Sequence, residues 1–404
     1  MRSETQPTVI VMVGLPARGK TYTARKLCRY LKWQGYKARV FNVGNYRRTR
    51  LGSNQPAAFF DPENAEGVNA RRTMAEAALI DVLAWLETEG QIAIYDATNA
   101  TRERRLWVRE QCEAQGVRVV FVESICDDPH IVEANIRETK LLSPDYIGAD
   151  PTDAVADFRT RIANYTRAYQ PIDDTSLSFV KLVDAGRQVV ANEISGFLLG
   201  RLVNYLMNLH IVPRTIWLSR HGESAYNQQG RIGGDSGLSP SGRAYGARLA
   251  RFLSERVAGT PTVWTSTLSR TVETAEYLPW ESLPLRALDE IDAGICDGLT
   301  YAEIQQQMPD EFDARARDKL SYRYPRGESY RDVIDRLNPV IIDLERKRRP
   351  LVIIAHQAVL RALYAYIADE TPRDCPHLDI PLHTVIELTP KAYGCDEQRF
   401  KLSG

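Results

Sequence analysis

The first half of the chain alternates short apolar runs with longer amphipathic stretches. The apolar runs are Val9–Val13, Ala38–Val43, Ile92–Tyr95 and Val117–Val122. The stretches between them carry hydrophobic residues at helical spacing, around Ala24–Trp33, Arg71–Glu87 and Arg104–Gln115. Strands that alternate with helices in this way form a mostly parallel sheet covered by helices. The pattern predicts an α/β unit.

The second half starts the same cycle again after a break at Val212-Pro213. Its expected elements are strand Thr215–Leu218, helix Gly242–Glu255, strand Val263–Thr265, helix Thr271–Tyr277, helix Tyr330–Lys347 and strand Leu351–Ile354. We therefore expect two α/β domains, residues 1–213 and 214–404, of which the first has a mostly parallel sheet and the second is an α/β sandwich.

Composition is that of an ordinary folded protein and offers no general attraction to a polyanion. The 404 residues suit two domains, with 44% hydrophobic and 26% charged residues. The formal net charge is +0, from 52 basic and 52 acidic residues, so neither nucleic acid nor a membrane surface is an expected partner. The run Val9–Val13 is too short to span a bilayer.

The cysteine pattern predicts reduced thiols in a cytoplasmic protein. The six cysteines are scattered, with no CxxC pair and no metal-ligand spacing to the six histidines. An apolar interface and an apolar core look alike in sequence, so the oligomeric state stays open and includes a homodimer.

A phosphate-binding loop follows the first apolar run. Its residues match G-x-x-x-x-G-K-[ST] between a strand and a helix pattern, and are Gly14, Leu15, Pro16, Ala17, Arg18, Gly19, Lys20 and Thr21. Backbone N–H groups of such a loop face phosphate oxygens, the lysine supplies charge, and the Thr21 hydroxyl can ligate Mg²⁺. This motif predicts ATP and Mg²⁺ as cofactors.

Asp96 ends the next buried-type strand, in Asp96-Ala97-Thr98-Asn99. Ligands bind at the carboxyl ends of parallel strands, so Asp96 can hold Mg²⁺ or accept the proton of an acceptor hydroxyl. Both roles stay open. The structural alternative is that Asp96 caps a helix beginning near Thr101.

Arginines follow each of these strand ends. They are Arg47, Arg48, Arg71, Arg72, Arg102, Arg104 and Arg105. Guanidinium groups bind phosphate bidentately, so the cluster is typical of an anionic acceptor such as a sugar phosphate. A solvated helix face remains the alternative for any single one of them.

A second motif, Arg220-His221-Gly222-Glu223, opens the second half at another strand end. Its expected partners are Arg270, Glu290 and His356, each just past an apolar run. Neutral His221 can attack phosphorus, while Arg220, Arg270 and a protonated His356 neutralise the phosphate oxygens. Glu290 would protonate the leaving oxygen and then activate water. This chemistry needs no metal.

With both motifs in this order, the sequence closely resembles the bifunctional 6-phosphofructo-2-kinase/fructose-2,6-bisphosphatase family, from Val9 to about Leu402. The resemblance rests on the two motifs and on six further segments, Phe41–Arg48, Asp96–Asn99, Ser143–Tyr146, Tyr205–Asn208, Gly230–Gly237 and Pro381–Val385. It implies a kinase that phosphorylates the 2-hydroxyl of fructose 6-phosphate, a phosphatase that reverses this, and control of glycolysis and gluconeogenesis.

The resemblance also implies roles for individual residues. In the kinase half, Asp96 and Cys126 are active-site positions, and Asn135 and Lys140 join the ATP-binding loop. The sugar-phosphate contacts there are Arg48, Arg71, Thr98, Arg104, Lys140, Arg161 and Tyr165. In the phosphatase half, His221 is phosphorylated and Glu290 donates the proton. The bisphosphate contacts there are Arg220, Asn227, Gly233, Tyr301, Arg315, Lys319, Tyr330, Gln357 and Arg361.

Three other functions compete with this one. The first is an enzyme in which only the kinase or only the phosphatase operates. The second is a nucleic-acid end-processing kinase–phosphatase, which would need a basic groove that the neutral composition does not favour. The third is a non-catalytic sensor, which the joint presence of Lys20, Asp96, His221, Glu290 and His356 disfavours.

Overall fold

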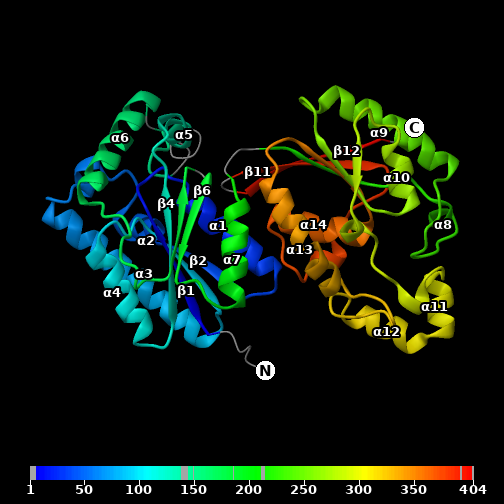
Figure 1. Cartoon of the computed structure of the whole chain (residues 1–404), viewed down its shortest axis with the longest axis horizontal. Coiled ribbons are helices and arrows are strands. Elements are labelled where there is room, and N and C mark those ends of the chain that lie inside the picture. Colours follow the sequence, from blue (N-terminus) through cyan, green and yellow to red (C-terminus); the bar gives the residue numbers. More distant parts are fainter. Residues whose placement is uncertain are drawn as a thin grey trace. The chain divides into compact units, whose positions relative to one another are not determined.

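The computed structural model describes residues 6–137, 144–148, 150–184, 186–210, 214–391 and 394–402. The chain splits into two compact units, the first ending at residue 211 and the second beginning at residue 212. Both units are α/β, as the hydrophobic pattern predicts (Figure 1). None of the helices in the described part combines the length and hydrophobicity needed to cross a bilayer.

The first unit is built on a six-stranded sheet in the order β2-β3-β1-β4-β5-β6. The strands are β1 Thr8–Val13, β2 Ala38–Asn42, β3 Ile92–Asp96, β4 Arg118–Ile125, β5 Phe179–Val183 and β6 Gln188–Asn192. The first five run parallel, and β6 pairs antiparallel with β5. Every residue of β1 and β3 is buried, which explains their unbroken apolar runs.

Helices cover both faces of this sheet. They are α1 Lys20–Trp33, α2 Val43–Leu51, η1 Ala57–Phe60, α3 Ala65–Thr88, α4 Arg102–Glu113, α5 Pro129–Asn135, α6 Pro151–Ala168 and α7 Phe197–Asn208. Buried residues of α3 and α4 share one core with the sheet, whereas α7 packs on α1 and β5. Parallel strands place the loops after β1, β3 and β4 at one edge, where ligands bind.

The second unit has its own six-stranded sheet, in the order β12-β11-β7-β10-β8-β9. Its strands are β7 Ile216–Arg220, β8 Thr262–Thr265, β9 Ser282–Pro284, β10 Leu351–Ala355, β11 Thr384–Lys391 and β12 Gly394–Lys401. The four strands β7 to β10 run parallel, and β11 is antiparallel to both β7 and β12.

Helices also cover both faces of the second sheet (Figure 1). They are α8 Ala225–Gln228, α9 Pro240–Arg256, α10 Ser269–Ala275, η3 Arg286–Leu288, η4 Gly294–Cys296, α11 Tyr301–Gln307, α12 Pro309–Arg317, α13 Tyr330–Arg346, α14 Gln357–Ala368 and η5 Cys375–His377. Buried residues of α9 and α10 form a core with β7, β8 and β10, while α14 packs on α13 and β7. The functional side chains follow the carboxyl ends of β7, β8 and β10.

Candidate active sites

The phosphate-binding loop closes tightly on the strand behind it. Gly14 has φ 130°, and a Cβ there would lie 2.4 Å from the carbonyl oxygen of Ser124. Gly19 has φ 79° and begins α1 in the left-handed region. The loop therefore needs glycine at both positions, because a side chain would clash or strain the backbone. Lys20 is only 8% exposed and donates to the carbonyl of Leu15 at 2.5 Å.

Asp96 is buried at the end of β3, beside the strand that leads into the loop. Its carboxylate accepts a hydrogen bond from Asn42 at 2.5 Å. The alternative role of Asp96 as a helix cap is wrong, because the side chain of Thr101 caps α4 by accepting from the backbone N–H of Arg104. A carboxylate and the Thr21 hydroxyl are oxygen ligands that suit Mg²⁺, which needs few protein ligands when phosphates supply the others.

Three arginines of the first unit converge on one carboxylate. Arg47 donates to both oxygens of Asp145, at 2.7 and 2.6 Å. Arg48 lies 3.4 Å and Arg161 lies 3.9 Å from the same group. Arg161 also pairs with Asp157 at 2.8 Å. Burial alone would raise the pKa of Asp145. The hydrogen bond from Arg47 and the charges of the three arginines together lower it by more, so the carboxylate is charged.

A second group of expected residues lies around aromatic rings. The guanidinium of Arg71 is 6.0 Å from the ring of Tyr165, which in turn hydrogen-bonds Thr98. Arg161 lies 4.5 Å from the ring of Phe60, and the Phe60 and Tyr165 rings are 6.0 Å apart. These contacts join Arg71, Thr98, Arg161 and Tyr165 in one cluster of side chains.

Arg104 is also half-buried, over the ring of Trp107 at 4.5 Å, and burial lowers its pKa. The groups that act on its charge are Tyr95 of β3, Glu76 and Arg72 of α3, and Glu103 of its own helix. Asn135 donates to the loop carbonyl of Ala17 at 3.0 Å. Lys140 lies outside the described residues.

Cys126 is 4% exposed just after β4. Burial raises the pKa of its thiol, although Arg18 nearby opposes the shift. A buried protonated thiol is a poor nucleophile, so this geometry favours a packing role beside the nucleotide loop.

The second site is centred on the buried ring of His221, which is 3% exposed at the end of β7. Its Nδ1 lies 2.7 Å from the carbonyl of Gly222, and its Nε2 accepts from Arg270 Nε at 3.2 Å. Burial and then Arg270 lower the pKa of His221 well below its usual value. The ring is therefore neutral, with the proton on Nδ1 and the lone pair on Nε2.

Arg270 is fixed from the opposite side as well. Its Nη1 donates to the carbonyl of Gly234 at 2.6 Å, within the loop Gly230–Gly237. The Asp235 carboxylate of that loop accepts from the backbone and hydroxyl of Ser269, at 2.7 and 2.9 Å. The loop and the first turn of α10 thus hold the guanidinium beside His221.

His356 follows β10 with 0% exposure, and its ring centre lies 5.1 Å from that of His221. Its Nε2 is 2.7 Å from Ser266 Oγ, and among the described residues its buried Nδ1 has no hydrogen-bond partner. The expectation of a protonated His356 is wrong, because the environment of its ring favours the neutral form. Burial, Arg270 and His221 all lower its pKa.

Glu290 and Arg220 lie at the same edge of the sheet. Glu290 accepts from the backbone N–H groups of Ile291 and Ala358, at 2.9 and 3.2 Å, so it sits at the N-terminus of α14. Arg220 donates to the carbonyl of Ile380, and burial lowers its pKa to about 10 although Glu290 opposes the shift.

Three more cations lie near one another, and one of them, Arg361, also lowers the pKa of Arg220. Lys319 donates to the carbonyl of Pro376 at 2.8 Å, and burial followed by Arg361 and Arg315 lowers its pKa to about 8. The two guanidinium groups are held by tyrosine hydroxyls, through the bonds Arg361–Tyr330 at 3.2 Å, Arg315–Tyr324 at 2.8 Å and Arg315–Tyr301 at 3.0 Å.

The remaining expected residues border the His221 loop. Asn227 accepts from Ser224 N at 3.0 Å and so braces the chain after Glu223. Gly233 has φ 68°, and a Cβ there would lie 1.6 Å from the Asp297 carboxylate. Gln357 begins α14, directly after His356.

Several groups that shape these sites escape sequence reasoning. They are Asp145, Asp157 and Phe60 in the first unit, and Ser266, Asp235 and Asp297 in the second. Most of them act across a long separation in the chain, so no local pattern marks them, whereas Asp157 pairs with Arg161 one helical turn away. The available signal is that Asp145 lies within Ser143–Tyr146 and Asp235 within Gly230–Gly237, two segments on which the resemblance rests.

Known proteins match both units. The 6-phosphofructo-2-kinase family model matches residues 1–213, and the histidine phosphatase superfamily (branch 1) model matches residues 216–402. A Gallus gallus protein named 6-phosphofructo-2-kinase/fructose-2,6-bisphosphatase is 51% identical over 403 residues, which cover 98% of this chain and 85% of that protein. A Homo sapiens relative, number 3 of the same name, is 50% identical over 96% of this chain and 76% of its own length.

An Arabidopsis thaliana protein of the same name is 49% identical over 99% of this chain, which spans 54% of that longer protein. Matches of this extent cover both units and both motifs. The chain therefore belongs to the 6-phosphofructo-2-kinase/fructose-2,6-bisphosphatase family, with a kinase domain followed by a histidine phosphatase domain.

Proposed function

We propose that this protein catalyses two opposed reactions on one metabolite and so controls glycolysis and gluconeogenesis. One transfers the γ-phosphoryl group of ATP to the 2-hydroxyl of fructose 6-phosphate, and the other hydrolyses fructose 2,6-bisphosphate to fructose 6-phosphate and phosphate. The observation that carries the proposal is that each unit holds the groups its own reaction needs. The first has Lys20 and Asp96 at neighbouring strand ends, and the second has neutral His221 beside Arg270 and His356.

In the kinase reaction, the loop from Gly14 to Thr21 receives the ATP phosphates. Its N–H groups at the start of α1 and the ammonium of Lys20 stabilise the charge that shifts toward the β-phosphate oxygens. Asn135 and Lys140 contact the nucleotide. Asp96 and Thr21 would hold Mg²⁺, which neutralises the phosphate charge. Asp96 also fits the second role, in which it accepts the proton of the 2-hydroxyl.

We infer that arginines of the first unit bind the sugar phosphate. Arg48, Arg71 and Arg161 would bind its 6-phosphate, with Thr98 and Tyr165 as neutral partners. Arg104, which lies apart from this cluster, would contact another part of the sugar phosphate. Arg48 and Arg161 already face the Asp145 carboxylate, which supports an anion site there. Anchoring the 6-phosphate leaves the 2-hydroxyl to reach the γ-phosphorus.

In the phosphatase reaction, the Nε2 lone pair of His221 attacks the phosphorus of the 2-phosphate. Glu290 donates its proton to the departing 2-oxygen, and the N–P bond replaces the O–P bond. Arg220 and Arg270 would stabilise the charge on the phosphate oxygens. The neutral ring of His356 would add an N–H donor at Nδ1, which has no partner among the described residues, while its Nε2 accepts from Ser266. The Glu290 carboxylate then takes a proton from water, which attacks the phosphohistidine and frees phosphate and His221. No step requires a cofactor.

Substrate orientation in the phosphatase comes from the pocket of Arg315, Lys319 and Arg361. Their charges would bind the 6-phosphate, with Tyr301 and Tyr330 completing the contacts and Asn227, Gly233 and Gln357 bordering the sugar. A substrate held by that end presents only its 2-phosphate to His221.

The protein works in the cytoplasm as a homodimer in this proposal. Its free thiols among the described cysteines support a reducing compartment. The edge strand β6 carries exposed residues along its length, and an open sheet edge can pair with a second copy. The rival one-sided enzyme is not favoured, because the expected catalytic side chains occur in both units.

A time course of fructose 2,6-bisphosphate in MgATP and fructose 6-phosphate tests the proposal. Wild type should reach a plateau at which synthesis and hydrolysis balance, and His221→Ala should pass that plateau and continue to accumulate the bisphosphate. If neither protein makes the bisphosphate, the kinase assignment fails. If both curves coincide, the phosphatase assignment fails.

A further inference from the structure

Arg105 does not point toward a ligand, although it stands in the arginine cluster that the sequence marks after Asp96. Its side chain is 2% exposed beneath the sheet edge. Nη1 donates to the carbonyls of Asn99 and Ala100, at 3.2 and 3.1 Å, and Nη2 donates to the carbonyl of Pro171 at 3.3 Å. A buried cation thus ties together main-chain segments that lie 70 residues apart in sequence.

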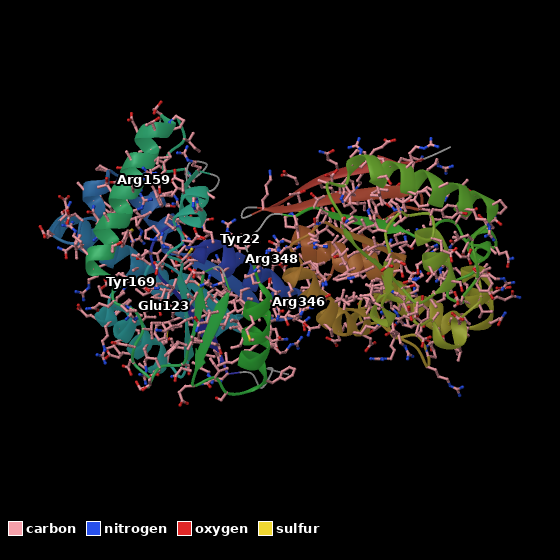
Figure 2. The ribbon with its side chains drawn as sticks, turned by 45° about the horizontal axis from the view of Figure 1, so that its top comes forward. Tyr22, Glu123, Arg159, Tyr169, Arg346 and Arg348 are labelled. Carbon is pink, nitrogen blue, oxygen red and sulfur yellow. The ribbon has the colours of Figure 1, made fainter. Side chains whose placement is uncertain are left out.

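Glu123 is the matching buried anion, in β4 with 0% exposure. It accepts from the hydroxyl of Tyr169 at 2.5 Å (Figure 2). It also accepts from the backbone of Ile172 at 3.1 Å, and Lys181 lies 3.5 Å away. Burial lowers the pKa of Arg105, and the nearby charge of Glu123 is the largest influence that opposes this. Lys181 and the hydrogen bonds from Tyr169 and Ile172 compensate the buried charge of Glu123, and that charge in turn favours the charged form of Arg105.

Arg105 and Glu123 contact main-chain segments next to the proposed binding site for fructose 6-phosphate. Gln170 N donates to the Ala100 carbonyl at 2.9 Å, so residues 99–100 and 169–172 are bonded to each other. The segment around Asn99 is also bonded to β1 and to the start of the phosphate-binding loop, because Asn99 donates to the Met12 carbonyl at 2.8 Å and Gly14 N donates to the Thr98 carbonyl at 3.0 Å. Asp96 and Thr98 precede this anchor directly, and Tyr165 hydrogen-bonds Thr98.

We propose that Arg105 and Glu123 are positioning residues of the kinase, which hold the Asp96–Asn99 segment in register with the phosphate-binding loop. Neither touches the substrate. The inference rests on the proposed kinase function. Its energetic basis is the cost of leaving buried carbonyls unpaired and of misplacing reacting groups by a fraction of an ångström.

The test compares Arg105→Met and Glu123→Gln with a matched control on the same helix. Arg109→Met makes the same change at a residue whose partner is Glu113, at 2.7 Å. The kinase kcat and the KM for each substrate are measured separately. The thermal unfolding midpoint of the first unit reports its folding, and the phosphatase rate, whose residues lie in the other unit, reports the protein concentration.

For Arg105→Met we expect kcat/KM for fructose 6-phosphate to fall about 30-fold, because small misplacements of reacting groups are costly. The KM for MgATP should change less than about twofold, since the phosphate-binding loop keeps its own backbone contacts. Glu123→Gln keeps an acceptor oxygen but loses the charge, so we expect about a fivefold loss in the same direction. Arg105→Lys should fall between Arg105→Met and wild type.

Two results would overturn the inference. One is an Arg105→Met kinase as efficient as Arg109→Met. The other is a loss of kinase activity in Arg105→Met and Glu123→Gln that only follows the loss of folded first unit, with both KM values unchanged, which would mark a purely structural role. An inactive wild-type kinase would instead contradict the proposed function, so the two failures are distinguishable.

Discussion

The two sites of this protein differ in what surrounds their cations before any phosphate arrives. In the kinase unit, Arg47, Arg48 and Arg161 already face the Asp145 carboxylate. In the phosphatase unit, Arg270 donates to a neutral imidazole, and burial followed by the nearby guanidinium groups of Arg361 and Arg315 lowers the pKa of Lys319.

This difference indicates two ways to build a phosphate site. In the kinase unit, the substrate phosphate has to compete with the Asp145 carboxylate for the arginines, which limits the gain in binding free energy. The same carboxylate holds the arginine side chains in position before substrate binds. The phosphatase cations repel one another, and a phosphate group relieves that repulsion. A preorganised positive site of the second kind stabilises developing charge without rearrangement.

The largest expected effect is the loss of the phosphatase reaction in a protein that keeps its kinase reaction. His221→Ala removes the nucleophile, so we expect phosphate release from fructose 2,6-bisphosphate to fall by more than about 10⁴-fold, since nucleophile deletions cost this much or more. The kinase kcat should stay within about twofold of wild type. A phosphatase rate within tenfold of wild type would mean that another group attacks phosphorus.

Lys20→Met is the corresponding substitution in the kinase site. Removing one charge that stabilises the transferring phosphoryl group should lower the kinase kcat by about 10²- to 10³-fold. Phosphatase activity of the same preparation should not change, because its residues lie in the other unit. Loss of both activities would show that the two sites are not independent.

Glu290→Gln keeps the shape of the side chain and removes its acid–base chemistry. We expect the phosphatase kcat to fall by about 10²-fold, the usual contribution of one general acid. The KM should change little, since the amide can still accept from Ile291 and Ala358. An unchanged kcat, measured across the pH range, would assign the proton to another group.

The smallest predicted effect is a pH dependence of substrate binding. Because the pKa of Lys319 is lowered to about 8, its ammonium is charged below that pH and is lost above it. The KM for fructose 2,6-bisphosphate should therefore rise by up to about tenfold per pH unit above 8. Lys319→Arg, which stays charged, should flatten this rise. A KM that is flat for wild type would contradict the electrostatic account of the pocket.

Much of the architecture is predictable because burial leaves a local pattern. The apolar runs of β1, β3, β7 and β10 and the two motifs at their ends lie where the sequence places them. Helix α6 and strands β5, β6, β11 and β12 were not among the expected elements. The antiparallel strands β6 and β12 expose most of their residues, so they lack the continuous apolar signal.

The properties that sequence could not supply are those that depend on distant neighbours. The neutral state of His356 comes from burial near Arg270 and His221, which lie far away in the chain. The burial of the Arg105 side chain likewise depends on Glu123 and on the carbonyl of Pro171, which follows α6. A residue type and its spacing indicate which chemistry is available, whereas its protonation and direction are fixed only by packing.

The central claim is that each site acts within its own unit on a metabolite that both share. A mixture of His221→Ala and Lys20→Met proteins, with each remaining site at its wild-type concentration, tests this most directly. The mixture in MgATP and fructose 6-phosphate should reach the same plateau of fructose 2,6-bisphosphate as wild type, because the bisphosphate diffuses between proteins. A plateau that differs severalfold from wild type, with both single activities intact, would contradict independent sites.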